Sequence, residues 1–380
     1  MKIKNTFQNL FIYRTKPSAY AKHKYATFRR FVVTKYKWIT KKLGVGKTKY
    51  LYTPPEGALP ERTEIFRKTD RLGKGAAGQV HKVEVGRGVF RAYKNAWDES
   101  PHIREGLQKE ESILRKLNHP NIVTTYSDPK TTKVVLINEQ ELNSDLEKVT
   151  ATDLDAEYVL VDEVTEETEP GIQMDLATCN LKEKIPQMTE KECLQYTREM
   201  LSAVQYLHKH NICHMDIKPD NILSMDGKAV LTDFDIAIQK KKKQGKIIVT
   251  QMNRDDVSCT LPYAAPELLE FKKRKPIPVA TLETTGCDVW SLGCTIAEIF
   301  TGELLFPSSY EGKNHYMNNY KGYPYEKRLN EFLQVYQQKM GPNIAKLLRD
   351  MLQTDPAKRI SGKQALAAFK KMYPAAAGKV

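Results

Sequence analysis

The chain has 380 residues, 41% of them hydrophobic, and a formal net charge of +14 at pH 7, which is enough for a large core and more than one typical domain. No apolar run approaches the roughly 20 residues that a membrane-spanning helix needs, and no cleavable leader is visible, so we expect a soluble protein without a Sec-type signal. The six cysteines show no C-x-x-C pair and no clustered histidines, which argues against a disulfide framework or a zinc site and predicts a reducing intracellular compartment such as the cytoplasm.

The first 50 residues carry the entire net charge. They hold 14 lysines or arginines and no acid, which leaves 60 − 14 = 46 basic residues against 46 acidic ones in the rest of the chain. Aromatic residues are interleaved with these cations, and Phe28, Phe31, Val32, Tyr36 and Ile39 recur at helical spacing, which predicts an amphipathic basic helix. Four roles stay open for it: binding an anionic membrane, binding another polyanion such as nucleic acid, targeting to an organelle, or packing on the folded core.

A proline-rich linker at residues 54–60 precedes a glycine motif. Residues 72–80 read LGKGAAGQV, which places Gly73, Gly75, Gly78 and Val80 in the spacing G-x-G-x-x-G-x-V. Glycines at these positions permit a tight hairpin and let backbone N–H groups approach nucleotide phosphates. The next predicted strand, residues 89–94, ends in A-x-K with Ala92 and Lys94.

A helix is predicted over residues 103–117, because leucines and isoleucines line one side and His119-Pro120 stops the pattern. Residues 127–170 then carry 13 acidic residues against 3 lysines, with apolar runs at 134–137 and 158–161 that predict strands inside an acidic insertion. A short strand running to Met174, Asp175 and Ala177 follows. Thr189 opens the next helix with the capping pattern T-E-K-E.

Residues 212–223, ICHMDIKPDNIL, are the most informative stretch. Their apolar ends predict two short buried strands that hold a proline-broken turn carrying Asp216, Lys218, Asp220 and Asn221. Such a turn can preorganise polar groups toward one reacting centre, although Pro, Asp and Asn also favour ordinary solvated turns. A second strand, ending in the sequence TDFD, places Asp233 ten residues beyond Leu223.

In this order and spacing, these motifs resemble eukaryotic-type protein kinases of the serine/threonine branch, over about residues 66–372. The resemblance implies a bilobal α+β fold, with a small mainly β N-lobe that includes one C-helix and a larger mainly α C-lobe. It places the extension and linker at residues 1–60, the N-lobe at 61–176 and the C-lobe at 177–380. It also implies ATP, Mg²⁺ and a protein substrate; the oligomeric state and kinase subfamily stay unassigned.

By the same resemblance, Asp216 is the catalytic base, Lys218 stabilises the transferred phosphoryl group, and Asn221 and Asp233 hold Mg²⁺. Lys94 contacts the α- and β-phosphates and pairs with Glu110 of the C-helix, with Glu111 as the adjacent alternative. The adenine pocket takes Ala92, Met174 as the gatekeeper, and backbone groups of Asp175 and Ala177, while the glycine motif and Val80 cover the phosphates.

More distant motifs extend the resemblance. Thr260 matches a threonine that contacts the catalytic Asp and Lys, Asp288 matches an Asp that braces the catalytic loop, and Arg359 is expected to pair with Glu267.

Two positions depart from the family pattern. Met215 stands where an Arg usually precedes the catalytic Asp, and Asp235 stands where a Gly usually follows Phe234. The first departure predicts activity without activation-loop phosphorylation. The second leaves two functions open: an active serine/threonine kinase, or a pseudokinase scaffold anchored by its basic N-terminal tail.

Overall fold

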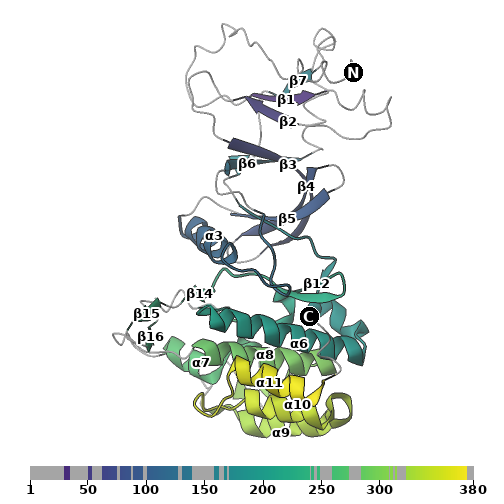
Figure 1. Cartoon of the computed structure of the whole chain (residues 1–380), viewed down its shortest axis with the longest axis vertical. Coiled ribbons are helices and arrows are strands. Elements are labelled where there is room, and N and C mark those ends of the chain that lie inside the picture. The colour runs from purple at the N-terminus through teal and green to yellow at the C-terminus, as the bar shows by residue number, and fades with distance from the viewer. Residues whose placement is uncertain are drawn as a thin grey trace. The chain divides into compact units, whose positions relative to one another are not determined.

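The computed structural model describes residues 30–34, 50–53, 62–74, 78–86, 89–96, 101–126, 131–138, 158–161, 167–168, 171–239, 241–243, 246–248, 259–273, 284–307, 309–310, 313–314 and 322–374. The chain divides into unit 1, Met1–Glu99 with Tyr126–Met174, and unit 2, Ser100–Thr125 with Asp175–Val380. Unit 1 is built of strands and unit 2 mainly of helices, which confirms the predicted α+β class (Figure 1). The lobe boundaries proposed from the sequence stay predictions.

Unit 1 contains a six-stranded sheet in the order β8-β6-β3-β4-β5-β9. Strand β6 runs parallel to β3, and the other neighbours are antiparallel. The glycine motif lies at the β3–β4 hairpin, as predicted, and the apolar run at 134–137 lies in β6. The strands are β3 Arg62–Lys74, β4 Gln79–Gly86, β5 Val89–Asn95, β6 Thr131–Asn138, β8 Glu167–Thr168 and β9 Ile172–Met174.

A second sheet in unit 1 corrects the prediction for the extension. Its order is β2-β1-β7, with β1 at Arg30–Thr34, β2 at Tyr50–Thr53 and β7 at Tyr158–Val161. The predicted amphipathic helix through residues 28–39 is therefore wrong. The segment Phe31-Val32-Val33-Thr34 consists of aromatic and β-branched residues that favour strands, and both edges of β1 are paired with other strands.

Unit 2 is mainly helical and contains several short two- and three-stranded sheets (Figure 1). Its helices are α3 Pro101–Leu114, α5 Leu181–Lys184, α6 Glu190–Lys209, α7 Pro266–Lys273, α8 Thr284–Thr301, α9 Tyr325–Val335, α10 Gln337–Met351 and α11 Gly362–Met372. Single 3-10 turns occur at η3 Ile185–Gln187, η4 Pro219–Asn221 and η6 Leu261–Tyr263. The strands are β10 Cys179–Asn180, β11 Ile212–Cys213, β12 Ile222–Met225, β13 Lys228–Leu231, β14 Ile238–Gln239, β15 Lys241–Lys243, β16 Lys246–Ile248, β17 Ser309–Tyr310 and β18 Lys313–Asn314.

Helix α8 forms the centre of this core. Its apolar residues lie on all sides, and such a helix is stable only when it is buried; nearly every α8 residue is indeed buried. A Cβ on Gly293 would lie only 2.9 Å from the Leu352 side chain, so the glycine allows α8 to approach the chain that follows α10. Among the described residues, no helix is both long and apolar enough to cross a bilayer.

The N-terminus of α6 carries the predicted capping box. The Thr189 hydroxyl accepts from the backbone N–H of Glu192, and the Glu192 carboxylate accepts from the backbone N–H of Thr189. Lys184 Nζ lies 2.9 Å from the same carboxylate. The backbone hydrogen bond from Thr189, then those from Lys184 and the Thr189 hydroxyl, lower the pKa of Glu192 from 4.5 to about 2.

This carboxylate makes stability pH-dependent. Because the pKa is lower in the folded state, ionised Glu192 stabilises the protein above its unfolded pKa of 4.5, and this contribution is lost as the pH falls toward 2. Glu192→Gln keeps a capping partner but does not titrate. We therefore expect the free energy of unfolding, measured in urea, to fall less steeply with acidification in Glu192→Gln than in the wild type. Identical pH slopes would contradict this expectation.

Candidate active site

The predicted catalytic loop lies between two strands of unit 2. Strand β11 enters it and pairs with β14, and β12 leaves it and pairs with β13. The apolar ends are confirmed as strands; Ile212, Cys213 and Ile222 are buried, whereas Leu223 is half-buried. Strand pairing at both ends restrains the turn between them. Such restraint is required if the turn is to hold reacting groups in a fixed geometry.

Three polar side chains of that turn, Asp216, Lys218 and Asn221, converge with Thr260 from a later segment. Lys218 Nζ donates to Asp216 Oδ2 at 2.6 Å and to Thr260 Oγ1 at 2.7 Å, and the Thr260 hydroxyl donates to Asp216 Oδ1 at 2.7 Å. Asn221 Nδ2 donates to both the backbone oxygen and Oδ2 of Asp216 at 2.9 Å. The predicted contact of Thr260 with Asp216 and Lys218 is therefore confirmed. These contacts hold the carboxylate of Asp216 in one orientation.

Asp288 of α8 stabilises the backbone of the loop through hydrogen bonds. Its carboxylate accepts the backbone N–H of His214 at 2.9 Å and of Met215 at 2.8 Å, as predicted. Met215 has φ 72°, in the left-handed region that side chains disfavour, so these two hydrogen bonds hold a strained backbone in place. His208 Nε2 lies 2.9 Å from the same carboxylate. His208, Cys213 and Asp288 are close enough to be considered as metal ligands, but both Asp288 oxygens already bind backbone amides.

The predicted metal ligands come from the two ends of one hairpin. Asn221 directly precedes β12, and Asp233 lies two residues beyond β13, where Ile222 pairs with Leu231. The Thr232 N–H donates to Asn221 O at 3.0 Å, which links the two ends. Because the Asn221 NH₂ group already binds Asp216, its oxygen is the atom suited to a cation. An amide oxygen and a carboxylate are the hard donors that Mg²⁺ prefers, so these residues fit the ion.

Glu110 of α3 is fully buried, and its Oε1 accepts the backbone N–H of Phe234 at 3.1 Å. Its neighbour Glu111 instead forms a surface pair with Arg115 at 2.7 Å on the same helix. The buried position favours Glu110 over Glu111 as the inward-facing acid. Its pairing with Lys94 joins residues of different units and stays a prediction.

Unit 1 holds the predicted phosphate-binding residues on adjacent strands. Gly73 pairs with Val80 across the β3–β4 hairpin, and Val80 pairs with Lys94 of β5. A Cβ on Gly78 would lie 2.4 Å from the carbonyl oxygen of Asn95, so only glycine fits there. Lys94 is only 5% exposed, which is unusual for a lysine. Gly75 lies outside the described residues.

The predicted adenine-binding residues lie in β5, at the end of β9 and in the chain beyond it. In unit 1, Ala92 pairs with Met174, and both side chains are buried. In unit 2, the Asp175 N–H donates to Thr124 O at 3.3 Å. That amide is therefore already used, and an adenine contact by Asp175 would fall on its carbonyl oxygen. Ala177 follows in irregular, half-buried chain.

Comparison with protein families decides the identity. The model of the protein kinase domain matches residues 66–369, well over half of the chain, and the match spans every motif described above. This chain belongs to the protein kinase family. Protein kinases bind ATP and a protein substrate, and they generally use Mg²⁺.

One departure from the kinase pattern, Asp235, fits its backbone without strain. Asp233 has φ 66°, whereas Asp235 does not have a positive φ, so no glycine is required at position 235 in this conformation. The Asp235 carboxylate accepts the backbone N–H of Ile236 at 2.7 Å. The side chain therefore adds a carboxylate two residues from the predicted metal ligand Asp233.

The other departure, Met215, predicts how this kinase is regulated. Its side chain is buried and uncharged, whereas binding a phosphorylated activation loop requires a cation such as arginine. By the family resemblance, the activation loop lies between Asp233 and Glu267 and includes Thr250 and Ser258. We therefore expect phosphatase treatment, or the double substitution Thr250→Ala and Ser258→Ala, to leave the turnover rate within a few-fold of the untreated wild type. Loss of turnover in either experiment would contradict this expectation.

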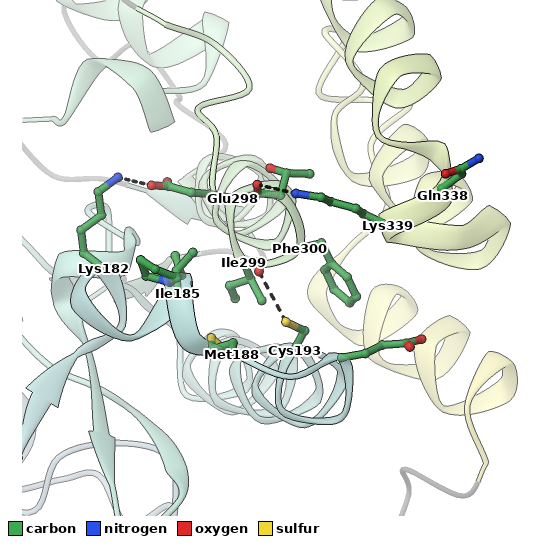
Figure 2. A pocket seen from close by; sticks show the side chains of 13 residues that line it. Lys182, Ile185, Met188, Cys193, Glu298, Ile299, Phe300, Gln338 and Lys339 are labelled. Atoms are coloured by element: carbon green, nitrogen blue, oxygen red, sulfur yellow. Dashed lines mark hydrogen bonds and ion pairs between the residues drawn. The ribbon is translucent and has the colours of Figure 1, made fainter.

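A pocket of about 630 Å³ lies elsewhere in unit 2, among η3 and the ends of α6, α8 and α10, and none of the predicted site residues lines it. Two lysines reach the last turn of α8 from opposite sides (Figure 2). Lys182 pairs with the buried carboxylate of Glu298, and Lys339 Nζ donates to Thr301 O at 3.5 Å. Cations at the C-terminal end of a helix complement its dipole, so we interpret Lys182 and Lys339 as residues that cap α8.

Sequence reasoning did not single out Glu298. The Tyr263 hydroxyl, three residues beyond Thr260, donates to the second carboxylate oxygen of Glu298 at 2.5 Å. Burial, followed by the nearby Glu298, raises the pKa of Tyr263, so its hydroxyl stays a donor. The available signal was one acid inside the apolar pattern CTIAEIF, since buried acids require partners.

Proposed function

We propose that this kinase transfers the γ-phosphoryl group of ATP to serine or threonine hydroxyls of a protein substrate. The observation that carries the proposal is the closed set of contacts among Asp216, Lys218, Asn221 and Thr260. These contacts hold the Asp216 carboxylate and the Lys218 ammonium group in fixed positions on a restrained loop. A scaffold that only presents surfaces to partners does not need this arrangement.

In the proposed reaction, the substrate hydroxyl oxygen forms a bond to the γ-phosphorus while the bond from that phosphorus to the bridging oxygen of ADP breaks. Asp216 accepts the hydroxyl proton, and Lys218, 2.6 Å from Asp216, stabilises the negative charge on the transferred group. Mg²⁺ supplies positive charge that neutralises the phosphate oxygens. Asn221 and Asp233 would hold the ion.

Nucleotide binding in this proposal uses residues of both units. The backbone of Gly73, Gly75 and Gly78, together with the Lys94 ammonium, would contact the phosphates. Val80, Ala92 and Met174 would pack on adenine, and the carbonyl of Asp175 and backbone of Ala177 would bind its polar edge. The pairing of Lys94 with Val80, next to the glycine hairpin, supports this role.

Three results test the proposal. Full-length protein with Mg²⁺ and γ-labelled ATP should transfer label to itself or to a generic basic-protein acceptor, chelation of the metal should stop the transfer, and acid hydrolysis should release phosphoserine or phosphothreonine. Phosphotyrosine as the product would overturn the assigned specificity. ATP binding without any transfer would favour the second candidate, a pseudokinase scaffold.

That second candidate rests on Asp235. An extra carboxylate near Asp233 raises the local negative charge, which strengthens metal binding but repels the phosphates. Asp235→Gly separates the two candidates: it should convert a pseudokinase into a measurable phosphotransferase, whereas in an active kinase it should only shift the Mg²⁺ concentration required for half-maximal rate.

A further inference from the structure

The basic extension and the acidic insertion meet in one sheet of unit 1. Strand β1 of the extension is the central strand, and it pairs with β7 of the insertion from Phe31↔Val161 to Thr34↔Tyr158. Figure 1 shows β1 and β2 beside β7, although more than a hundred residues separate β1 from β7 in sequence. We call this sheet β2-β1-β7 the accessory sheet.

The extension and the insertion, which supply the strands of the accessory sheet, are both connected along the chain to neighbouring strands of the six-stranded sheet. The extension continues from β2 into β3, and within the insertion β7 follows β6 and precedes β8. Strand β6 pairs with β3 on one side and with β8 on the other. Because both segments belong to one chain and join strands of the same sheet, their effective concentration is high, so a pairing of only four residues can persist.

The two segments also carry opposite charge. The first 50 residues contain 14 lysines or arginines and no acid, and residues 127–170 contain 13 acids against 3 lysines. Opposite charges of this size attract over about a Debye length, roughly 10 Å at 0.1 M salt. The strands therefore supply the register of the contact, and the charges increase its strength at low salt.

We propose that the acidic insertion is the intramolecular partner of the basic extension, and that its pairing competes with binding of the extension to an anionic membrane surface. Aromatic residues interleaved with cations, as in residues 7–38, suit a bilayer interface. While β1 is paired with β7, the negative charge of the insertion offsets the positive charge of the extension. When β1 separates from β7, the positive charge of the extension becomes available to anionic lipid headgroups.

The register of the pairing gives a test with an internal control. Val32 is opposite Leu160, whereas Val159 is opposite Val33 and so lies on the other face from Val32. In the full-length chain under mild oxidation, Val32→Cys with Leu160→Cys should form a disulfide that peptide mapping detects. Val32→Cys with Val159→Cys should not. Cross-linking of both pairs, or of neither, overturns the proposed contact, provided both reduced variants unfold at the wild-type temperature.

The competition is tested with lipid vesicles. Phosphatidylserine vesicles should lower the yield of the Val32–Leu160 disulfide, and phosphatidylcholine vesicles should not. Competition by single- or double-stranded nucleic acid without competition by phosphatidylserine would overturn the choice of a membrane, and equal yields under all conditions would overturn the competition itself.

Charge neutralisation gives an independent measurement. Changing the six acids between residues 140 and 157 to their amides should tighten binding to phosphatidylserine vesicles on the order of tenfold at low salt, as if one or two more cations reached the surface. The six positions are Glu141, Asp145, Glu147, Asp153, Asp155 and Glu157. The matched control has equal net charge and changes six acids of unit 2: Glu183, Glu303, Glu326, Glu331, Asp350 and Asp355. Equal tightening in both variants would show a general charge effect and overturn the proposal.

Discussion

Asp216→Asn is expected to lower the rate of phosphoryl transfer by about 10²–10⁴, because the amide cannot accept the hydroxyl proton. The substitution should preserve the loop. The amide oxygen of the new asparagine can still accept from Lys218 and Asn221. Its NH₂ group can donate to the Thr260 hydroxyl, so that this hydroxyl becomes an acceptor where it was a donor in the wild type. We therefore expect the nucleotide dissociation constant to change by only a few-fold. Initial rates with saturating Mg·ATP, and nucleotide titration of the same preparation, measure the two effects.

Asp226→Asn is a suitable control for this experiment. Asp226 is exposed in the β12–β13 turn at φ 48°, a conformation that asparagine also tolerates, so the same chemical change there should leave the rate unaltered. A rate for Asp216→Asn within a few-fold of the wild type would contradict the role of Asp216 as catalytic base. It would also point to a contaminating kinase in the preparation.

Arg359→Leu is expected to destabilise the fold by about 3–5 kcal/mol, because it leaves the carboxylate of Glu267 without its buried partner. Arg359 donates to the two oxygens of Glu267 at 2.5 and 3.1 Å, and its side chain is 1% exposed. It also donates to the carbonyl oxygens of Gly286 and Gln353 and stacks over Trp290 at 5.0 Å. The midpoint of urea unfolding should fall while the slope stays constant.

The neighbouring residue provides the control. Lys358 forms an exposed pair with Asp355 at 3.9 Å, and surface pairs of this kind contribute little, so Lys358→Leu should move the midpoint only slightly. Adding Glu267→Leu to Arg359→Leu should recover part of the loss, since no charge is then left unpaired. If Arg359→Leu prevents folding, Arg359→Lys, which keeps the charge but loses the planar fork, gives the measurable intermediate. Equal effects of Arg359→Leu and Lys358→Leu would refute the structural role.

The catalytic loop was predictable because its determinants are local. The apolar residues Ile212, Cys213 and Ile222 flank a proline-broken turn, and this pattern alone indicates two anchors around restrained polar groups. The capping box at Thr189 and Glu192 is equally local. The partners of Asp216 beyond the loop were predictable only through the family resemblance, since Thr260 lies 44 residues away and no periodicity connects the two.

The extension shows why the rest was not predictable. Residues 28–39 fit a helical period, but Phe31–Thr34 also suits a strand, and the choice depends on partners at Leu51 and Leu160. Pairing over such sequence distances is set by the whole fold. The parallel alignment of β6 with β3 is a further example, because the apolar run at 134–137 predicts a strand but does not specify its neighbour.

The most direct test of the account is a crystal structure of the kinase with Mg²⁺ and a non-hydrolysable ATP analogue. We predict that Lys94 of unit 1 contacts the α- and β-phosphates while Asn221 and Asp233 of unit 2 coordinate the ion. Asp216 should face the γ-phosphate. A nucleotide bound without Lys94, or an ion held without Asn221 and Asp233, would contradict the proposed phosphotransfer reaction.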